Sequence, residues 1–385
     1  MPDQRLPGFA TRAVHAGQEP DRTTGSITPA IHQTSTFVQD GIGGLRGGYE
    51  YGRSGNPTRT AFEQQVAALE QGTSAVAFAS GLAAEDALLR AVLGAGDRVL
   101  LGDDAYGGTY RLLKRLHEPA GVRLETVDLT DAAAVEAAFA EPVRMLWIET
   151  PTNPLMKVVD IAALAAVGHA GGALVVVDNT FASPALQQPL PLGADVVVHS
   201  ATKYLGGHSD ALGGVVVTSD EALAERVRFL QFAAGAVLAP FEAWLLTRGI
   251  KTLDLRMRRH TESAGAIAAQ LAAHPAVERV YYPGLPDHPG HDIAARQMSG
   301  SGGMLSVALA GGEAAARSLA ERTRLFALAE SLGGVESLIG YPSLMTHASV
   351  RGTPLAVPEN VVRLSVGVED LADLQQDLED ALSTR

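Results

Sequence analysis

Two short apolar runs, ALVVVDN (residues 173–179) and ADVVVHSATK (residues 194–203), set the fold class of this 385-residue chain. Both are rich in valine and end on polar residues, which is typical of strands buried inside a sheet. Similar runs are SAVAFAS, RVLLG, VRMLWIE and GGVVVTS, and helix-like segments lie between several of them. This alternation predicts an α/β domain with a mostly parallel central sheet.

The chain on either side of this domain has a different composition. Residues 1–60 are rich in Gly, Thr, Ser and Pro and show little periodicity, so they are expected to form an arm that packs on another subunit or stays loose. Residues 61–248 carry the alternating pattern. Residues 249–385 begin with a long helical stretch, continue with strand-like pieces and end in a helix, which predicts a smaller α+β domain.

Composition excludes several classes of protein. A net charge of −13 without a long basic stretch argues against a nucleic-acid partner. With no cysteines, the chain has no disulfides, thiolate metal sites or cysteine nucleophiles. It has no apolar run of about 18 residues and no apolar stretch near its start, so no membrane partner is expected and a cytoplasmic location is predicted.

Asp178 and Lys203 lie near the ends of the two opening runs, each at a predicted carboxyl end of a strand. If the strands are parallel neighbours, both side chains emerge at one edge of the sheet, where α/β proteins bind ligands. A lysine and a carboxylate so placed suit pyridoxal phosphate, because the lysine bonds to the aldehyde and the acid pairs with the ring nitrogen. Taken singly, a turn aspartate and a solvated loop lysine are the simpler interpretations.

A phosphate site is predicted where SAVAFAS runs through Ser80-Gly81-Leu82 into a helix, because backbone N–H groups at a helix start attract anions. Ser200 and Thr202 offer hydroxyl groups, and Arg53 offers a full charge. A nucleotide-binding oxidoreductase is the rival interpretation. It is weakened because no G-x-G-x-x-G follows a strand and no G-x-x-x-x-G-K-[ST] occurs.

Two further residues could serve a cofactor or its substrate. Tyr106 follows the strand-like RVLLG, and its ring could stack on a flat cofactor while its hydroxyl moves protons, although a half-buried loop tyrosine is the simpler interpretation. Arg363 lies in a strand-like run, where its guanidinium needs a carboxylate from the protein or from a substrate. The cluster DHPGHD (residues 287–292) could suggest a metal site, but without cysteines or an H-E-x-x-H helix a polar surface turn is expected.

Motifs along nearly the whole chain together resemble one family of enzymes. They are TPAIHQTSTF, YGRSGNPTR, ASGLAA, DDAYGGT, ETPTNP, VVVDNTFASP, HSATKYLGGHSD, AESLGGVESL, MTHAS and RLSVGVE. The chain resembles the Cys/Met-metabolism family of pyridoxal-phosphate enzymes, and most closely its trans-sulfuration branch, the cystathionine γ-lyases and γ-synthases. The resemblance implies a fold-type I, aspartate aminotransferase-like architecture and a homotetramer built as a dimer of dimers.

The resemblance also implies roles for residues at the matching positions. Tyr51 and Arg53 would reach the phosphate from a neighbouring subunit, which explains the glycine-rich arm. Gly81, Leu82, Ser200 and Thr202 would complete the phosphate site. Tyr106 would stack on the cofactor ring, Asp178 would pair with its nitrogen, and Lys203 would be the Schiff-base lysine. Asn153 and Arg363 would bind the substrate carboxylate, and Ser331 would lie behind the lysine.

The far end of the substrate site separates the branches of this family. Glu50, Arg111 and Glu330 fall where the resemblance implies charged residues that handle cystathionine, and a carboxylate suits its distal ammonium group. The expected reaction is α,γ-elimination of cystathionine to cysteine, 2-oxobutyrate and ammonia. The alternative uses the same residues to join O-succinyl- or O-acetylhomoserine to cysteine. A catalytically dead assembly protein on the same scaffold is disfavoured, because no key residue is missing.

Overall fold

The computed structural model describes residues 6–353 and 355–383, and its chain packs as two compact units. Unit 1 comprises the residues up to Val92 together with Asp195–Asp254, and unit 2 comprises Leu93–Ala194 and the residues from Leu255 onward. This division differs from the three parts expected from the sequence, which remain a prediction. No helix among the described residues has the length and apolar character needed to span a membrane.

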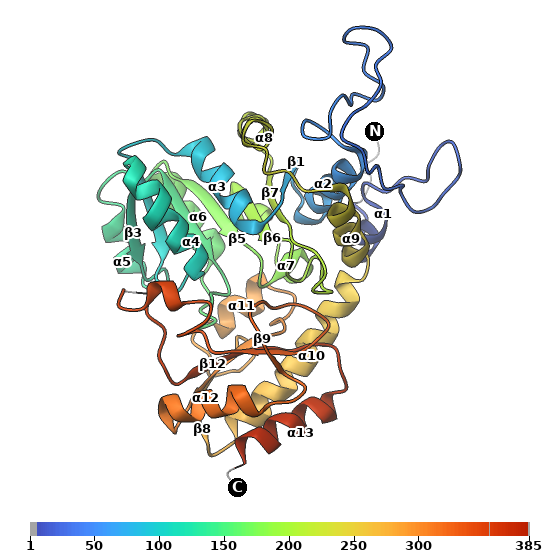
Figure 1. Ribbon diagram of the computed structural model, residues 1–385. Helices are drawn as coiled ribbons and strands as arrows, with labels where there is room; N and C mark the ends of the chain where they lie inside the picture. The colour runs from blue at the N-terminus through green and yellow to red at the C-terminus, as the bar shows by residue number, and fades with distance from the viewer. Residues whose placement is uncertain (1–5, 354, 384–385) are drawn as a thin grey trace. The chain divides into compact units, whose positions relative to one another are not determined.

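Unit 1 holds three strands in the order β1-β7-β6, with β7 antiparallel to both neighbours. Its strands are β1 (Ser74–Phe78), β6 (Val196–Ser200) and β7 (Gly214–Thr218), and its helices are α1 (Phe9–His15), α2 (Pro57–Glu70), α3 (Gly81–Val92), α8 (Glu221–Ala234) and α9 (Pro240–Ile250). The α2 helix begins sharply because Asn56 accepts the N–H groups of Thr58 and Arg59 and Pro57 occupies its first position. The segment between α1 and α2 contains no helix, and Figure 1 shows it as extended loops.

The first part of unit 2 is a parallel group of strands in the order β5-β4-β2-β3. These strands are β2 (Arg98–Gly102), β3 (Arg123–Val127), β4 (Met145–Glu149) and β5 (Leu174–Asp178). The associated helices are α4 (Gly107–Leu112), a π-helical turn (Leu113–His117), a 3₁₀ turn (Glu118–Ala120), α5 (Ala132–Ala138), α6 (Ile161–Ala170), α7 (Ser183–Leu186) and a 3₁₀ turn (Leu190–Leu192). Side chains of α5 and α6 share one buried core with alternate residues of these strands, such as Leu146 and Val175.

The second part of unit 2 is a sheet in the order β10-β11-β12-β9-β8. Its strands are β8 (Val277–Tyr281), β9 (Met304–Leu309), β10 (Ala327–Leu328), β11 (Leu338–Gly340) and β12 (Val361–Ser365), and its helices are α10 (Leu253–Ala272), α11 (His291–Gln297), α12 (Gly312–Arg322), a 3₁₀ turn (Ala348–Val350) and α13 (Leu371–Leu382). One core joins α10, α12 and α13 to a face of this sheet (Figure 1). The predicted α/β class is confirmed. The antiparallel pairs are those that β7 makes in unit 1 and the β11-β12, β12-β9 and β9-β8 pairs of this second sheet.

Candidate active site

The predicted phosphate site of unit 1 is the start of α3, directly after β1. The Ser80 hydroxyl accepts the N–H of Ala83, but the N–H groups of Gly81 and Leu82 have no partner within the part of the chain that the structure describes. Ser200, the last residue of β6, lies so close that a methyl group on Gly81 would sit 2.9 Å from its Cβ. Two available amides beside a serine can receive a phosphate group, so this helix start remains the candidate phosphate site.

A second glycine lets the backbone of this site approach β7. A methyl group on Gly214 would lie 2.1 Å from the Ser80 carbonyl oxygen and 2.7 Å from the Gly81 Cα. Any side chain at Gly214 would therefore push the Ser80-Gly81 turn away from β7. The sequence analysis did not single out this residue, although the GG pair before VVVTS indicated a close approach of backbone.

Lys203 follows β6 in a turn that the main chain holds firmly. Its N–H donates to the Ser200 carbonyl at 3.2 Å, and its carbonyl accepts the N–H of Gly207 at 2.8 Å. Gly207 has a φ of 71°, a left-handed conformation that favours glycine. The Thr202 hydroxyl lies 3.1 Å from the N–H of Gly213, whose hydrogen it accepts. The prediction that a strand ends at Ser200 and that the chain then turns is confirmed.

Glu50, Tyr51 and Arg53 lie on the arm of unit 1. The Arg53 guanidinium lies 4.8 Å from the ring centre of Phe232 in α8 and 5.6 Å from that of Tyr51. Tyr51 is 46% exposed and Glu50 is also exposed, so neither side chain is buried by its own chain. These residues remain candidates for a site that a second subunit completes.

In unit 2, Asp178 is the last residue of β5, as predicted, and is buried. One oxygen of its carboxylate accepts the N–H of Thr180 at 2.9 Å, which fixes the side chain at the strand end. Asp178 and Lys203 belong to different units, so their proximity stays a prediction.

Tyr106 lies at the start of α4, and a residue at the end of β4 binds its backbone. Its N–H donates to the buried Glu149 carboxylate at 2.7 Å. A methyl group on Gly108 would lie 2.2 Å from a carbon of the Tyr106 ring, so this ring position requires glycine there. The sequence analysis missed Glu149, although the rule that selected Asp178, a carboxylate at the end of an apolar run, also applies to VRMLWIE.

Asn153, Arg363 and Ser331 lie together in unit 2. The resemblance implies that Asn153 and Arg363 bind the substrate carboxylate and that Ser331 lies behind the lysine, and these roles stay predictions. One nitrogen of the buried Arg363 guanidinium donates to the Asn153 side-chain oxygen at 2.9 Å, and another donates to the Ser331 carbonyl at 2.9 Å. Ser331 has a φ of 102°, a strained value for a residue with a side chain. Such strain is concentrated at functional sites, which agrees with the proposed location.

His347, which lies in the MTHAS motif, is a buried member of this group that the sequence analysis assigned no role. Its Nε2 donates to the Asn153 carbonyl at 3.0 Å, and its Nδ1 lies 2.9 Å from the Thr346 hydroxyl. Burial, and then the positive charge of Arg363, lower the pKa of His347 to about 4. The imidazole is therefore neutral at neutral pH, and it holds the Asn153 backbone. No periodic pattern in the sequence marks it.

Asp104 connects the loop that precedes Tyr106 to the segment that carries Asn153. Its carboxylate accepts hydrogen bonds from the Thr152 hydroxyl and, at 2.9 Å, from the Leu155 N–H. Burial raises the pKa of Asp104 to about 7, although these two hydrogen bonds and Lys157 act in the opposite direction. The sequence shows two adjacent aspartates here and gives no sign that only the second is buried.

The remaining predicted residues of unit 2 are exposed. Arg111 lies on α4 and Glu330 directly precedes Ser331, and both side chains face solvent. The first four residues of the DHPGHD segment form a turn, as expected, and its last two begin α11. The prediction of a surface turn is wrong for His288. This side chain is buried, and its Nδ1 accepts the N–H of Gly290. Among the described residues, no group of three or more His, Asp or Glu side chains is placed to hold a metal ion.

Comparisons with known proteins show the family of this chain. The chain belongs to the family of Cys/Met metabolism PLP-dependent enzymes, whose model matches residues 10–383. It is therefore a trans-sulfuration enzyme whose cofactor is pyridoxal phosphate. The residues fit this cofactor, because the amides beside Gly81 can receive a phosphate group where a Cβ would not fit.

Three relatives are similar over almost their whole length. The cystathionine γ-synthase of Mycobacterium bovis is 59% identical over 98% of both chains. The cystathionine β-lyase of Lactococcus lactis is 49% identical over 99% of this chain and 100% of its own. The solved structure of the cystathionine γ-lyase of Lactobacillus plantarum has a TM-score of 0.93 and is 47% identical, covering 97% of this chain and 98% of its own.

Proposed function

We propose that this enzyme is a cystathionine γ-synthase, which joins an O-acylated homoserine to cysteine. The observation that carries the proposal is the 59% identity to the mycobacterial γ-synthase, against 49% and 47% to the two lyases. The γ-lyase activity preferred from the sequence becomes the second candidate. It is supported by the Lactobacillus structure and by the exposed carboxylate of Glu330, which suits the distal ammonium of cystathionine.

The proposed reaction exchanges one bond at the substrate Cγ. The Cγ–O bond breaks and releases the acyl group as a carboxylate, and the cysteine thiol loses its proton and forms the Cγ–S bond. In the γ-lyase alternative, the Cγ–S bond of cystathionine breaks instead, and water releases 2-oxobutyrate and ammonia. Both reactions begin with loss of the substrate Cα proton, so the same residues serve both.

We propose the following roles for the chain's own residues. Bound pyridoxal phosphate supplies an electron sink for the charge left at the substrate Cα. The Lys203 amine takes the Cα proton and moves it along the substrate, Asp178 keeps the ring nitrogen protonated, and Tyr106 stacks on the ring and exchanges protons with the substrate amine. Gly81, Leu82, Ser200 and Thr202 bind the phosphate.

Arg363 and Asn153 fix the substrate by its carboxylate, and Ser331 lies behind Lys203. Because the Arg363 guanidinium is already oriented by Asn153 and Ser331, its planar fork is prepared for a two-point contact with a carboxylate. Glu50, Arg111 and Glu330 are proposed for the distal groups. Tyr51 and Arg53 would reach the phosphate from a neighbouring subunit of a homotetramer, and the cytoplasmic location stays a prediction from the sequence.

Two assays on the purified holoenzyme distinguish the candidates. Cystathionine alone is supplied first and 2-oxobutyrate is measured, and then O-succinyl- or O-acetylhomoserine is supplied with cysteine and cystathionine is measured. A γ-synthase forms cystathionine much faster than it releases 2-oxobutyrate. Rapid 2-oxobutyrate release with negligible cystathionine formation would refute the γ-synthase and support the γ-lyase.

A further inference from the structure

Unit 2 contains a cavity of about 670 Å³ that includes none of the predicted active-site residues. Its walls come from the segment after β3, from the segment that follows Asn153 and leads into α6, and from β8 with the loop before α11. This volume lies within the usual range for small-molecule sites of roughly 300–1,000 Å³. The cavity is therefore large enough for a ligand of its own.

The lining is mostly apolar, and two of its charged side chains are paired with other residues of the protein. The apolar walls are formed by Leu129, Val135, Leu155, Val158, Leu164, Val167 and Ile293. The Lys157 ammonium is neutralised by Asp103 and Asp128, at 2.8 and 3.2 Å. Asp160 binds the N–H of Ala163 and the guanidinium of Arg296. These fixed pairs leave little charge for a ligand to meet along the walls.

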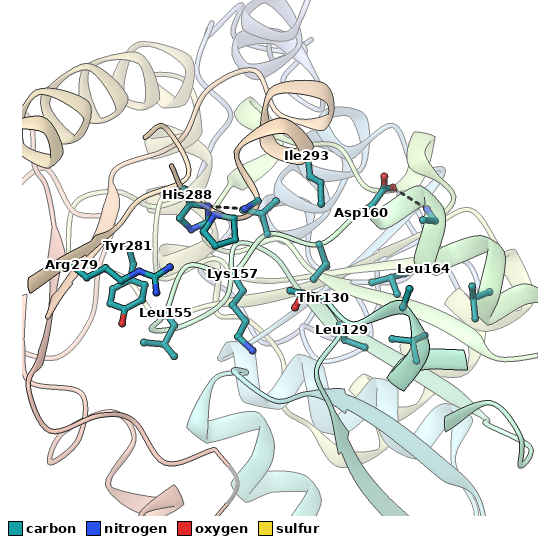
Figure 2. Close-up of a pocket in the computed structure, with 18 residues that line it drawn as sticks. Leu129, Thr130, Leu155, Lys157, Asp160, Leu164, Arg279, Tyr281, His288 and Ile293 are labelled. Carbon is teal, nitrogen blue, oxygen red and sulfur yellow. Dashed lines mark hydrogen bonds between the residues drawn. The ribbon is translucent and has the colours of Figure 1, made fainter. Parts of the chain in front are cut away.

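Arg279 is different from the other charged residues of the lining. Its guanidinium lies 4.9 Å from the ring centre of Tyr281, and no carboxylate within residues 6–353 and 355–383 pairs with it. Figure 2 shows Arg279 and Tyr281 together at one end of the cavity and Leu164 at the other, with Lys157 and Leu129 between them. The cavity thus presents one available cation at one end and an apolar surface beyond it.

We propose that this cavity is a second ligand site, which takes a small molecule with one carboxylate and an apolar body. The carboxylate pairs with Arg279 in the planar, two-point geometry that guanidinium groups favour, and the apolar body covers Leu129, Leu155 and Leu164. A doubly charged phosphate suits the cavity less well, because the lining beyond Arg279 is mostly apolar and would leave the second charge without a partner.

The site is coupled to the substrate through the wall segment that follows Asn153. The Lys157 N–H donates to the Thr152 hydroxyl at 2.7 Å, and the Thr152 N–H donates to the Lys157 carbonyl at 3.0 Å. Leu155 and Lys157 line the cavity, so a ligand there contacts the same hydrogen-bonded turn that presents Asn153 to Arg363. Occupancy therefore changes the KM for the amino-acid substrate, a consequence that rests on the proposed role of Asn153.

The binding test uses octanoate on the holoenzyme by calorimetry, with octan-1-ol and octylammonium as probes that lack the negative charge. Octanoate binds saturably at one site per chain, and octan-1-ol binds at least about 10-fold more weakly because it lacks the charge-assisted hydrogen bonds. Arg279→Gln weakens the binding of octanoate by a similar factor of at least about 10. Ala163→Trp, which fills the cavity from the exposed side of α6, removes binding. Equal binding of octanoate and octan-1-ol, equal binding to wild type and Arg279→Gln, or no saturable binding would overturn the site.

The matched control is Arg317→Gln, which removes an arginine stacked on Tyr341 outside the cavity and keeps octanoate binding. The coupling is tested separately by measuring substrate KM at saturating octanoate. The KM shifts at least about twofold in wild type and in Arg317→Gln but not in Arg279→Gln. An unchanged KM with intact binding would refute the coupling alone. Calorimetry does not depend on turnover, so the binding result stands even if the proposed reaction fails.

Discussion

The predicted phosphate site of unit 1 and the proposed carboxylate-binding group of unit 2 are built in opposite ways. The phosphate site uses backbone amides and small residues, and what it requires is the absence of side chains at Gly81 and Gly214. The carboxylate-binding group uses buried side chains that are distant in sequence: Asn153 and Arg363 are 210 residues apart, and His347 and Asn153 are 194 apart. The first site is sensitive to added atoms, and the second is sensitive to lost hydrogen bonds.

Lys203→Ala is expected to have the largest effect, because it removes the group proposed to move every proton at the substrate. The expected loss in kcat is at least about 10³-fold, with an unchanged circular-dichroism spectrum. Lys251→Ala, a lysine at the end of α9, is the control and should retain turnover. Borohydride should attach the cofactor to wild type and Lys251→Ala but not to Lys203→Ala. Retained turnover without Lys203 would contradict its role.

Arg363→Lys tests the side-chain group of unit 2. Lysine keeps the charge but cannot donate at once to Asn153, Ser331 and a substrate carboxylate, so KM should rise by about 10²-fold while kcat falls less. The exposed Arg351, which pairs with Glu359, provides the matched control Arg351→Lys, with unchanged kinetics. A fall in kcat of about 10²-fold with an unchanged KM would show that Arg363 does not act in substrate binding.

The two regions also differ in how far the sequence could predict them. The strand ends at Asp178 and Ser200 and the helix start at Gly81 follow from local patterns, and all three are confirmed. The resemblance alone indicated Asn153 and Ser331. Pairing between residues distant in sequence depends on the fold and leaves no local pattern. This is why His347, 194 residues from Asn153, and Asp104, 48 residues from Thr152, were missed. Burial of His288 was missed for the same reason, because Pro and Gly neighbours predict a turn but not what covers it.

Gly81→Ala tests the phosphate site by adding one methyl group. The new Cβ would lie 2.9 Å from the Ser200 Cβ, so the turn must shift away from the position that receives the phosphate. Overpacking of this kind costs about 1–3 kcal/mol, which predicts a cofactor Kd at least about 5-fold higher. Gly94→Ala has room for its methyl group and is the control. Unchanged cofactor affinity in Gly81→Ala would remove this helix start from the phosphate site.

His347→Ala should raise KM by about 10-fold, because the Asn153 backbone loses its donor. His347→Gln can still donate to that carbonyl and should restore part of the loss, which a purely space-filling role would not predict. Since the pKa of His347 is lowered to about 4, the imidazole stays neutral across the working range. The KM of wild type should therefore show no titration by this group between about pH 6 and 8. Equal KM values for the Ala and Gln variants would argue against a hydrogen-bonding role.

Asp104→Asn should change the stability of the protein more than its activity. The expected change is in how the stability depends on pH. The folded protein holds the Asp104 proton up to a pKa of about 7, whereas an unfolded aspartate releases it near 3.8. The folded state therefore binds more protons between these values, and wild type loses stability as the pH rises toward and through 7. Asparagine keeps an oxygen for Thr152 and Leu155 but carries no charge.

Between about pH 5.5 and 8, the free energy of unfolding of wild type should fall by about 2 kcal/mol more than that of Asp104→Asn, measured as a steeper fall in Tm. The exposed Asp287→Asn should follow wild type, and parallel Tm profiles for wild type and Asp104→Asn would show that this carboxyl is ionised in the folded protein.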